Sequence, residues 1–254
     1  MSKRRAMSSA EASRVKKAGH SAEKEFAELI GGKVYSSHTG MKKDVLDKNN
    51  DFHSVKSGNK KWQIFLYGKK RFEDDDIFQV LNGFAELFLG CIYSFPESRE
   101  EYLNDKRYFK EKLTKYMIAL KEKLEVKIKL KAFLSMSLFN GGEVNYLTIK
   151  EHDGTFHIFK NNEVINILSD NIVAENSKAR QDNQFNNQKV VFKYDDVAIG
   201  EIEMRNDSNV HYRQVKFWLG RDKTFSLLTK NINKKEEMCS RIFVYGQAIK
   251  TFTC

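Results

Sequence analysis

The stretch Gly40–Tyr67, GMKKDVLDKNNDFHSVKSGNKKWQIFLY, decides the fold that we expect for this chain. Its turn-forming sequences, KNND and GNKK, separate segments with the composition and alternation of strands. Strands are therefore predicted at Lys43–Asp47, Phe52–Ser57 and Trp62–Tyr67. Because side chains alternate between the two faces of a strand, Ser54 and Lys56 are expected to share one face and His53 to lie on the other.

Helices are predicted on both sides of this stretch. Apolar residues recur at helical spacing in Ser8–Ile30, where Gly19-His20-Ser21 could interrupt the helix, and again in Asp76–Leu89 and Pro96–Glu125. Lys33–Ser37 adds a further short strand. A helix, several strands and a second helix within the first third of the chain indicate an α/β (α+β) fold, with a mixed sheet flanked by helices.

Beyond residue 126 the sequence reads as strands and turns. The predicted strands are Lys127–Phe139, Gly142–Lys150, Thr155–Phe159, Glu163–Leu168, Val190–Tyr194 and Val197–Arg205. Hairpin turns are expected at 140–142, 153–154 and 161–162, and a polar loop at 169–188. This pattern divides the chain into a core at 1–95, a charged helical connection at 96–130 and a strand-rich region at 131–254.

The positive charge is concentrated in the first third of the chain. The 254 residues contain 44 Lys and Arg against 34 Asp and Glu, which gives a net charge of +10. Residues 1–73 hold 17 of these basic residues and only 8 of the acidic ones. Such a field attracts phosphate backbones and acidic surfaces, although a basic arm that only improves solubility would give the same pattern.

Several classes of protein are disfavoured by the sequence. No apolar run approaches the ~18–20 residues of a membrane span, and the first residues lack the apolar centre of a signal peptide. The three cysteines do not make a disulfide framework. Phosphate-loop, zinc-ligand and Gly-any-Ser-any-Gly spacings are absent from the sequence. A cytoplasmic protein without a membrane partner is therefore expected.

Asp44 and Lys56 are the candidate centre of the chemistry. They belong to neighbouring predicted strands joined by a short turn, so the carboxylate and the ammonium can meet around one phosphate. Hydrolysis of a phosphodiester needs such a pair. A carboxylate holds a divalent cation that lowers the pKa of a bound water, and an ammonium stabilises the charge that builds up on phosphorus.

In this arrangement the sequence resembles the PD-(D/E)XK nucleases, which include most type II restriction endonucleases. The family pattern is an aspartate, a short gap and acid-any-lysine on the adjacent strand, and it maps onto Asp44 and Ser54-Val55-Lys56. The resemblance implies that Asp44 and the carbonyl of Val55 bind Mg²⁺ and that Lys56 orients or activates the attacking water. Gly19-His20-Ser21-Ala22-Glu23 resembles the helix opening of related Holliday-junction resolvases, which implies that Glu23 supports the site.

Ser54 departs from the family pattern, because a hydroxyl does not supply the negative charge of a carboxylate. In some restriction enzymes with a similar Ser-any-Lys arrangement, a glutamate farther along restores the ligand, and Glu73 and Glu23 are the two candidates here. Gln63, on the next predicted strand, could hydrogen-bond a phosphate or a metal-bound water, or it could be an ordinary exposed glutamine. The alternative interpretation of Ser54 and Lys56 is a solvated strand face without catalytic function.

Two sets of residues are candidates for contacts with DNA. Backbone phosphates could be contacted by the basic residues around Trp62–Tyr67, namely Lys60, Lys61, Lys69, Lys70 and Arg71. Base edges could be read by a predicted hairpin at 205–216, through Arg205, Asn206, Asp207, Ser208, His211, Arg213 and Gln214. The alternative in both cases is an ordinary solvated surface.

A rival catalytic centre is predicted in the C-terminal half. Glu201 and Glu203 would share one face of a strand, and some nucleases use Glu-any-Glu with an upstream aspartate. Asp196 would be that aspartate, and Lys216 could serve as the lysine. The first site is preferred because its strand already carries the lysine at the expected offset.

The sequence thus predicts a Mg²⁺-dependent, sequence-specific endonuclease that acts on double-stranded DNA as a monomer or homodimer. The resemblance implies that it leaves 5′-phosphates. The alternatives are a structure-selective nuclease such as a Holliday-junction resolvase, a non-enzymatic nucleic-acid-binding module, and a protein that binds acidic partners through its basic first third.

Overall fold

The framework of the structure is a pair of β-sheets. The computed structural model describes residues 9–35, 42–58, 60–80, 83–179 and 185–254. The first sheet contains, in spatial order, β1 (Lys33–Val34), β2 (Val45–Leu46), β3 (Phe52–Lys56), β5 (Tyr146–Lys150), β6 (Phe156–Lys160), β12 (Ile242–Tyr245) and β11 (Lys235–Cys239). The β3–β5 and β6–β12 pairs are parallel and the other neighbours are antiparallel, so the sheet is mixed.

The second sheet is antiparallel throughout. It contains, in spatial order, β4 (Lys61–Tyr67), β10 (Val215–Gly220), β9 (Val197–Met204), β8 (Lys189–Tyr194) and β7 (Val173–Asn176). Each sheet therefore takes strands from both the predicted core and the predicted C-terminal region. The boundary expected at 96–130 does not separate two sheets.

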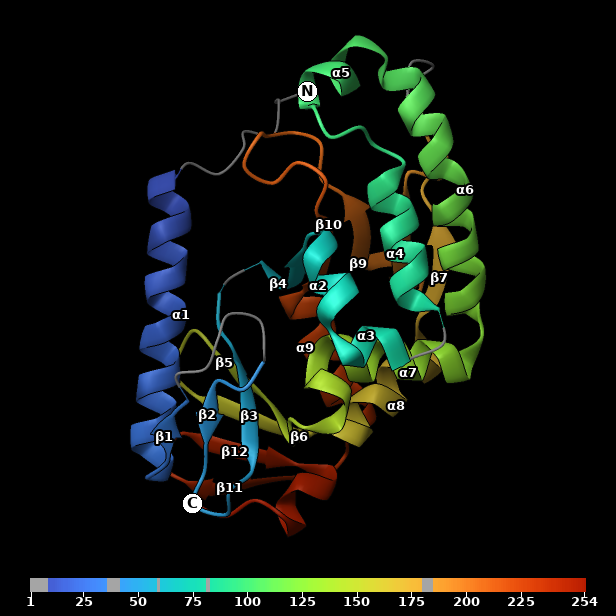
Figure 1. Cartoon of the computed structure of the whole chain (residues 1–254). Coiled ribbons are helices and arrows are strands. Elements are labelled where there is room, and N and C mark those ends of the chain that lie inside the picture. The colour runs from blue at the N-terminus through green and yellow to red at the C-terminus, as the bar shows by residue number, and fades with distance from the viewer. Residues whose placement is uncertain (1–8, 36–41, 59, 81–82, 180–184) are drawn as a thin grey trace.

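Helices surround the two sheets. In chain order they are α1 (Ser9–Ile30), α2 (Lys69–Asp74), α3 (Asp76–Val80), α4 (Phe84–Tyr93), α5 (Arg99–Asn104), α6 (Lys106–Glu125), α7 (Lys127–Phe139), α8 (Asn161–Asn171) and α9 (Arg221–Asn231), with short 3₁₀ turns at η1 (Asn140–Gly142) and η2 (Gly246–Lys250). Figure 1 shows α1 along one side of the molecule and α6 along the opposite side. This combination of helices with a mixed and an antiparallel sheet confirms the predicted α/β class.

The apolar core has two parts, one on each face of β3. On one face, Ala22 and Phe26 of α1 pack against Val55 of β3. On the other face, the larger cluster joins β5, β6 and the second sheet to α4, α6, α7 and α8, with Phe133 of α7 among its fully buried side chains. β3 is consequently an interior strand with protein packed on both sides.

Two predicted strands are wrong, because both segments are helices. In 127–139, lysines alternate with Ile128 and Leu130 over a few residues, which resembles a strand, but Ile128 is 72% exposed in α7. The segment buries residues at helical spacing, beginning with Leu130, Phe133 and Leu134. Glu163–Leu168 belongs to α8 for the same reason, since Val164 and Leu168, four residues apart, are the buried positions.

Of the predicted turns and loops, some are confirmed and others are replaced by helical or strand structure. The hairpin at 153–154 is confirmed between β5 and β6, whereas 140–142 is a 3₁₀ turn and 161–162 begins α8. The segment predicted as a loop at 169–188 contains β7. α1 is one continuous helix, so the possible interruption at Gly19-His20-Ser21 does not occur.

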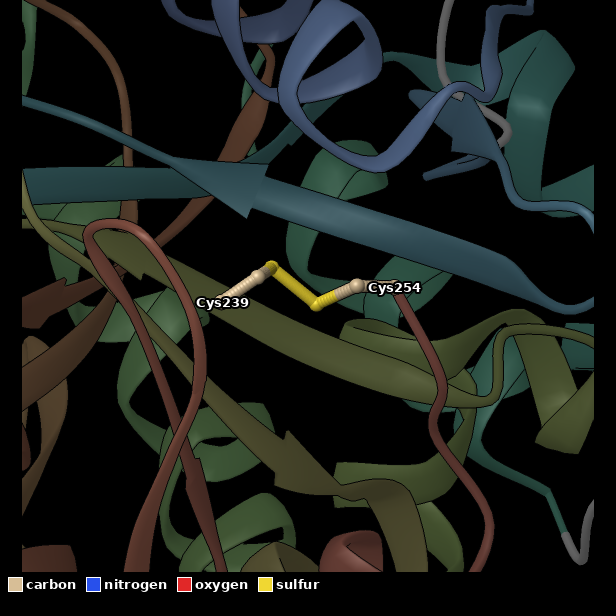
Figure 2. The surroundings of a disulfide bond; sticks show 2 residues. All are labelled: Cys239 and Cys254. Atoms are coloured by element: carbon tan, nitrogen blue, oxygen red, sulfur yellow. A yellow bond between two sulfur atoms is a disulfide. The ribbon is translucent and has the colours of Figure 1, made fainter.

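One disulfide links the C-terminal segment to the edge of the first sheet. Cys239 of β11 is bonded to Cys254, and Figure 2 shows this bond among the neighbouring ribbons. The expectation of no disulfide framework thus missed a single bond, because spacing along the sequence does not show which cysteines meet. Phe252 on the same segment is buried edge-on against the ring of His53. Among the described residues, every helix is too short or too polar to cross a lipid bilayer.

The buried histidines predict acid sensitivity of the fold. Burial lowers the pKa of His157 to about 4 and also lowers the pKa of His53. In the unfolded chain these histidines bind a proton near pH 6.5, whereas in the folded chain their rings stay neutral at that pH. The free energy of unfolding is therefore highest above pH 6.5 and decreases as the pH falls. For His157 alone we expect the free energy of unfolding to fall by about 2 kcal/mol between pH 7 and pH 5.

Urea denaturation at the two pH values measures this loss. His157→Gln removes the titrating ring, so the loss should shrink by about that amount. An unchanged pH dependence in the variant would show that the folded chain does not hold His157 neutral.

Candidate active site

Asp44 lies where β2 and β3 diverge, and its side chain replaces a strand partner there. β2 pairs with β3 only at Phe52 and His53, and the Asp44 N–H extends this pairing by donating to the carbonyl of His53 at 3.0 Å. Farther along β3, the Val55 N–H has no β2 partner and donates instead to Asp44 Oδ2 at 2.7 Å. Backbone pairing therefore fixes the carboxylate against the open edge of β3.

Lys56 and Ser54 meet this carboxylate from the same face of β3. The Lys56 ammonium lies 3.5 Å from Asp44 Oδ2 and donates to Ser54 Oγ at 2.6 Å and to the carbonyl of Val55 at 3.4 Å. The Ser54 hydroxyl in turn donates to Asp44 Oδ2 at 3.3 Å. Strand alternation is confirmed here, because His53 lies on the opposite face and bonds Thr148.

These side chains are not on a solvated strand face. Ser54 is fully buried, and the side chains of Lys56 and Asp44 are only 14% and 23% exposed. β5 pairs with β3 on the side away from Asp44, and core residues of both sheets lie beyond it. The structure therefore contradicts the alternative in which Ser54 and Lys56 are ordinary surface residues.

The oxygen donors of this cluster are of the type that Mg²⁺ prefers. Asp44 offers a carboxylate and Val55 a carbonyl, and Mg²⁺ is commonly held by one or two carboxylates together with water and phosphate oxygens. Within the described parts of the chain, no group of three or more His, Cys, Asp or Glu is placed to hold a metal on its own.

Neither glutamate proposed to replace the missing acid contacts the cluster directly. Glu23 lies on α1, which packs on the far face of β3, and its carboxylate pairs with His20 at 3.1 Å. Glu73 lies on α2, where it accepts from the hydroxyl of Tyr93 at 2.9 Å and pairs with Lys69 at 3.5 Å. Their role as metal ligands stays a prediction.

A cavity of about 780 Å³ lies beside the Asp44–Lys56 cluster and collects several predicted residues. Gln63 of β4 lines it, together with Lys69, Lys70 and Arg71 of α2. β4 itself belongs to the second sheet, so Gln63 does not follow Lys56 onto the next strand of the same sheet. Lys60 and Lys61 lie at the opposite end of β4, where the ammonium of Lys61 sits 3.2 Å from the ring centroid of Trp218.

Lys42 also lines the cavity, and sequence reasoning missed it. Burial and the charge of Lys56 are the main causes that lower its pKa to about 7, with Arg71 acting in the same direction and Asp44 against it. Its neighbour Lys43 turns the other way and pairs with Glu143 at 3.0 Å. Strand alternation could not have identified Lys42, because its backbone is left-handed (φ 58°) rather than extended.

The rival site is an ion-pair network on the second sheet. Glu203 pairs with Lys189 at 2.6 Å and with Lys216 at 3.5 Å, and Glu201 pairs with Lys189 at 3.2 Å. Sequence reasoning missed Lys189, which neutralises both carboxylates. Asp196 lies in the two-residue β8–β9 turn, five residues from Glu201 and thus roughly 16 Å away along the strand. The structure does not bring Asp196 to the predicted centre.

The predicted base-reading hairpin exists as a loop between β9 and β10, and its polar groups already have partners within the protein. Asp207 holds the Arg205 guanidinium through two bonds of 2.7 and 2.8 Å. The Asn206 amide donates to the hydroxyl of Tyr102 at 2.9 Å. The ring of His211 bonds the side chain of Gln214, and its backbone N–H donates to the hydroxyl of Ser208. The guanidinium of Arg213 pairs with Glu97 and donates to the carbonyl of Ile92. Base reading by this loop stays a prediction that requires these bonds to be exchanged.

Neither a protein-family model nor any curated protein matches the chain.

Proposed function

We propose that the chain is a Mg²⁺-dependent endonuclease that cuts double-stranded DNA at specific sequences. The observation that carries the proposal is the 3.5 Å approach of the Lys56 ammonium to the Asp44 carboxylate, beside the Val55 carbonyl. These are the residues that match the PD-(D/E)XK pattern, and they come from adjacent parts of one sheet. The concentration of basic residues in 1–73 supports nucleic acid as the substrate.

Each residue of the cluster has a defined part in the proposed hydrolysis. Mg²⁺, when bound, would make a coordinated water more acidic and neutralise charge on the phosphate. Asp44 and the Val55 carbonyl would hold that ion. Lys56 would donate to a phosphate oxygen as negative charge builds up on it, and Ser54 keeps the ammonium directed toward Asp44.

The overall reaction adds one water across the P–O3′ bond. The water oxygen bonds to phosphorus as the P–O3′ bond breaks. One water proton leaves to solvent, and the departing 3′-oxygen takes up a proton, so the products are a 5′-phosphate and a 3′-hydroxyl. No covalent intermediate on the protein is required.

Digestion of phage DNA with and without Mg²⁺ tests the proposal. Discrete bands that appear only with Mg²⁺ are the expected result. A smear, or cutting confined to a branched substrate, would instead indicate a structure-selective nuclease such as a junction resolvase. Retained DNA binding without any cutting would indicate a non-enzymatic binding module.

A further inference from the structure

The cavity beside the candidate site has the chemistry of a phosphate-binding subsite. We propose that Lys42, with Lys70 and Arg71, binds a backbone phosphate of a nucleic-acid strand adjacent to the phosphate that is cut. This inference rests on the proposed function for its substrate, but it assigns a separate contact to residues outside the Asp44–Lys56 cluster.

The first support is an excess of basic over acidic residues in the cavity lining, where Lys42, Lys69, Lys70 and Arg71 occur with Asp74 and Asp75. The Lys42 ammonium and the Arg71 guanidinium both approach the ring of Tyr67, so two basic side chains lie close together. Asp75 pairs with Arg71 at 2.7 Å. Among the described residues no carboxylate lies within ion-pair distance of the ammonium of Lys42 or of Lys70. An anion bound between them would relieve the repulsion.

The second support is the shape and lining of the space. Its volume of about 780 Å³ is much larger than a single ion needs. The ring of Tyr67 forms part of the wall, with the Lys42 ammonium 5.9 Å and the Arg71 guanidinium 5.1 Å from its centroid. Gln63 adds an exposed amide, and the outer edge of β4 has no strand partner within the described chain. An aromatic ring among cations suits the sugar and base that accompany a phosphate.

The third support is continuity with the proposed site. Lys42 precedes Asp44, the partner of Lys56, by two residues in the chain, and it lines the cavity together with Arg71. A strand whose scissile phosphate lies at Lys56 would therefore meet Lys42 as it leaves the cluster. A free phosphate ion would use the same cations, but it would not require the aromatic wall.

Binding of a fluorescein-labelled 20-bp duplex in EDTA, followed by anisotropy at several NaCl concentrations, tests the inference without cleavage. Lys42→Met should weaken binding at least fivefold at 100 mM NaCl and reduce the slope of log K against log[salt] by about 1, as expected for one lost phosphate contact. Lys42→Arg keeps the charge and should stay within twofold of the wild type. Lys230→Met, an exposed lysine of α9 outside the cavity, is the matched control and should change nothing.

Unchanged affinity and slope in Lys42→Met would overturn the inference, as would absence of duplex binding by the wild type. Inorganic phosphate at constant ionic strength distinguishes the two sources of the anion. If it shifts the Lys42 side-chain NMR signal while Lys42→Met still binds the duplex normally, the cavity is a free-anion site and the inference fails.

The outcome is separable from that of the proposed function. If the wild type cuts DNA and Lys42→Met binds the duplex normally, the nuclease proposal stands and the subsite proposal fails. If the wild type binds DNA through Lys42 but does not cut it, the subsite proposal stands and the nuclease proposal fails.

Discussion

Replacing Lys56 by alanine is expected to lower the rate of Mg²⁺-dependent DNA cleavage at least about 10²-fold. A positioned donor to developing transition-state charge typically contributes 10²–10³ to the rate, and Lys56 is the ammonium that reaches the Asp44 and Val55 oxygens. The fold should persist, because Asp44 keeps its bonds from the Val55 N–H and the Ser54 hydroxyl.

Single-turnover cleavage of a plasmid, with circular dichroism on the same sample, measures both expectations. Lys56→Met is the matched variant, since it keeps the aliphatic stem in the partly buried position and removes only the charge. Both variants should lose activity alike. Full activity in either, with an intact spectrum, would show that Lys56 takes no part in the chemistry.

Duplex affinity is expected to fall about 100-fold between 50 and 200 mM NaCl. Each neutralised phosphate contributes a slope of about −0.9 to log K against log[salt], and about four contacts from basic residues of the first third give this change. Lys60 and Lys70 are exposed and can reach a backbone, whereas Arg205 is already held by Asp207.

Replacing Lys60 and Lys70 together by methionine should reduce the salt slope by about 2 and weaken binding to all DNA sequences equally. Anisotropy titrations on two unrelated duplexes measure both effects. An affinity that does not respond to salt would be incompatible with duplex DNA as the partner.

The sequence was sufficient to predict the meeting of Asp44 and Lys56, because it depends on local rules. A short turn returns the chain beside itself, and strand alternation directs Ser54 and Lys56 to one face. The burial of Ser54 was not predictable in the same way. It depends on packing with distant segments, such as β5, which lies about ninety residues later in the chain and pairs in parallel with β3.

The pairing of β4 and the helix at 127–139 were also not predicted. Nothing in Lys61–Tyr67 specifies that β4 leaves its neighbours to pair with β10 in the second sheet. Residues 63–67 of this strand line the cavity together with Lys42 and Arg71. In 127–139 a short alternation of lysine and apolar residues resembles a strand, although the buried residues, Leu130, Phe133 and Leu134 among them, recur at helical spacing.

The most direct test of the account compares cleavage by Asp44→Asn with cleavage by Glu203→Gln. Both changes replace one carboxylate by an amide of the same shape, one at the proposed centre and one in the ion-pair network on β9. We predict that Asp44→Asn cuts at least about 10²-fold more slowly than the wild type, whereas Glu203→Gln cuts at a rate close to it. Normal cleavage by Asp44→Asn, or loss of cleavage only in Glu203→Gln, would contradict the assignment of catalysis to Asp44 and Lys56.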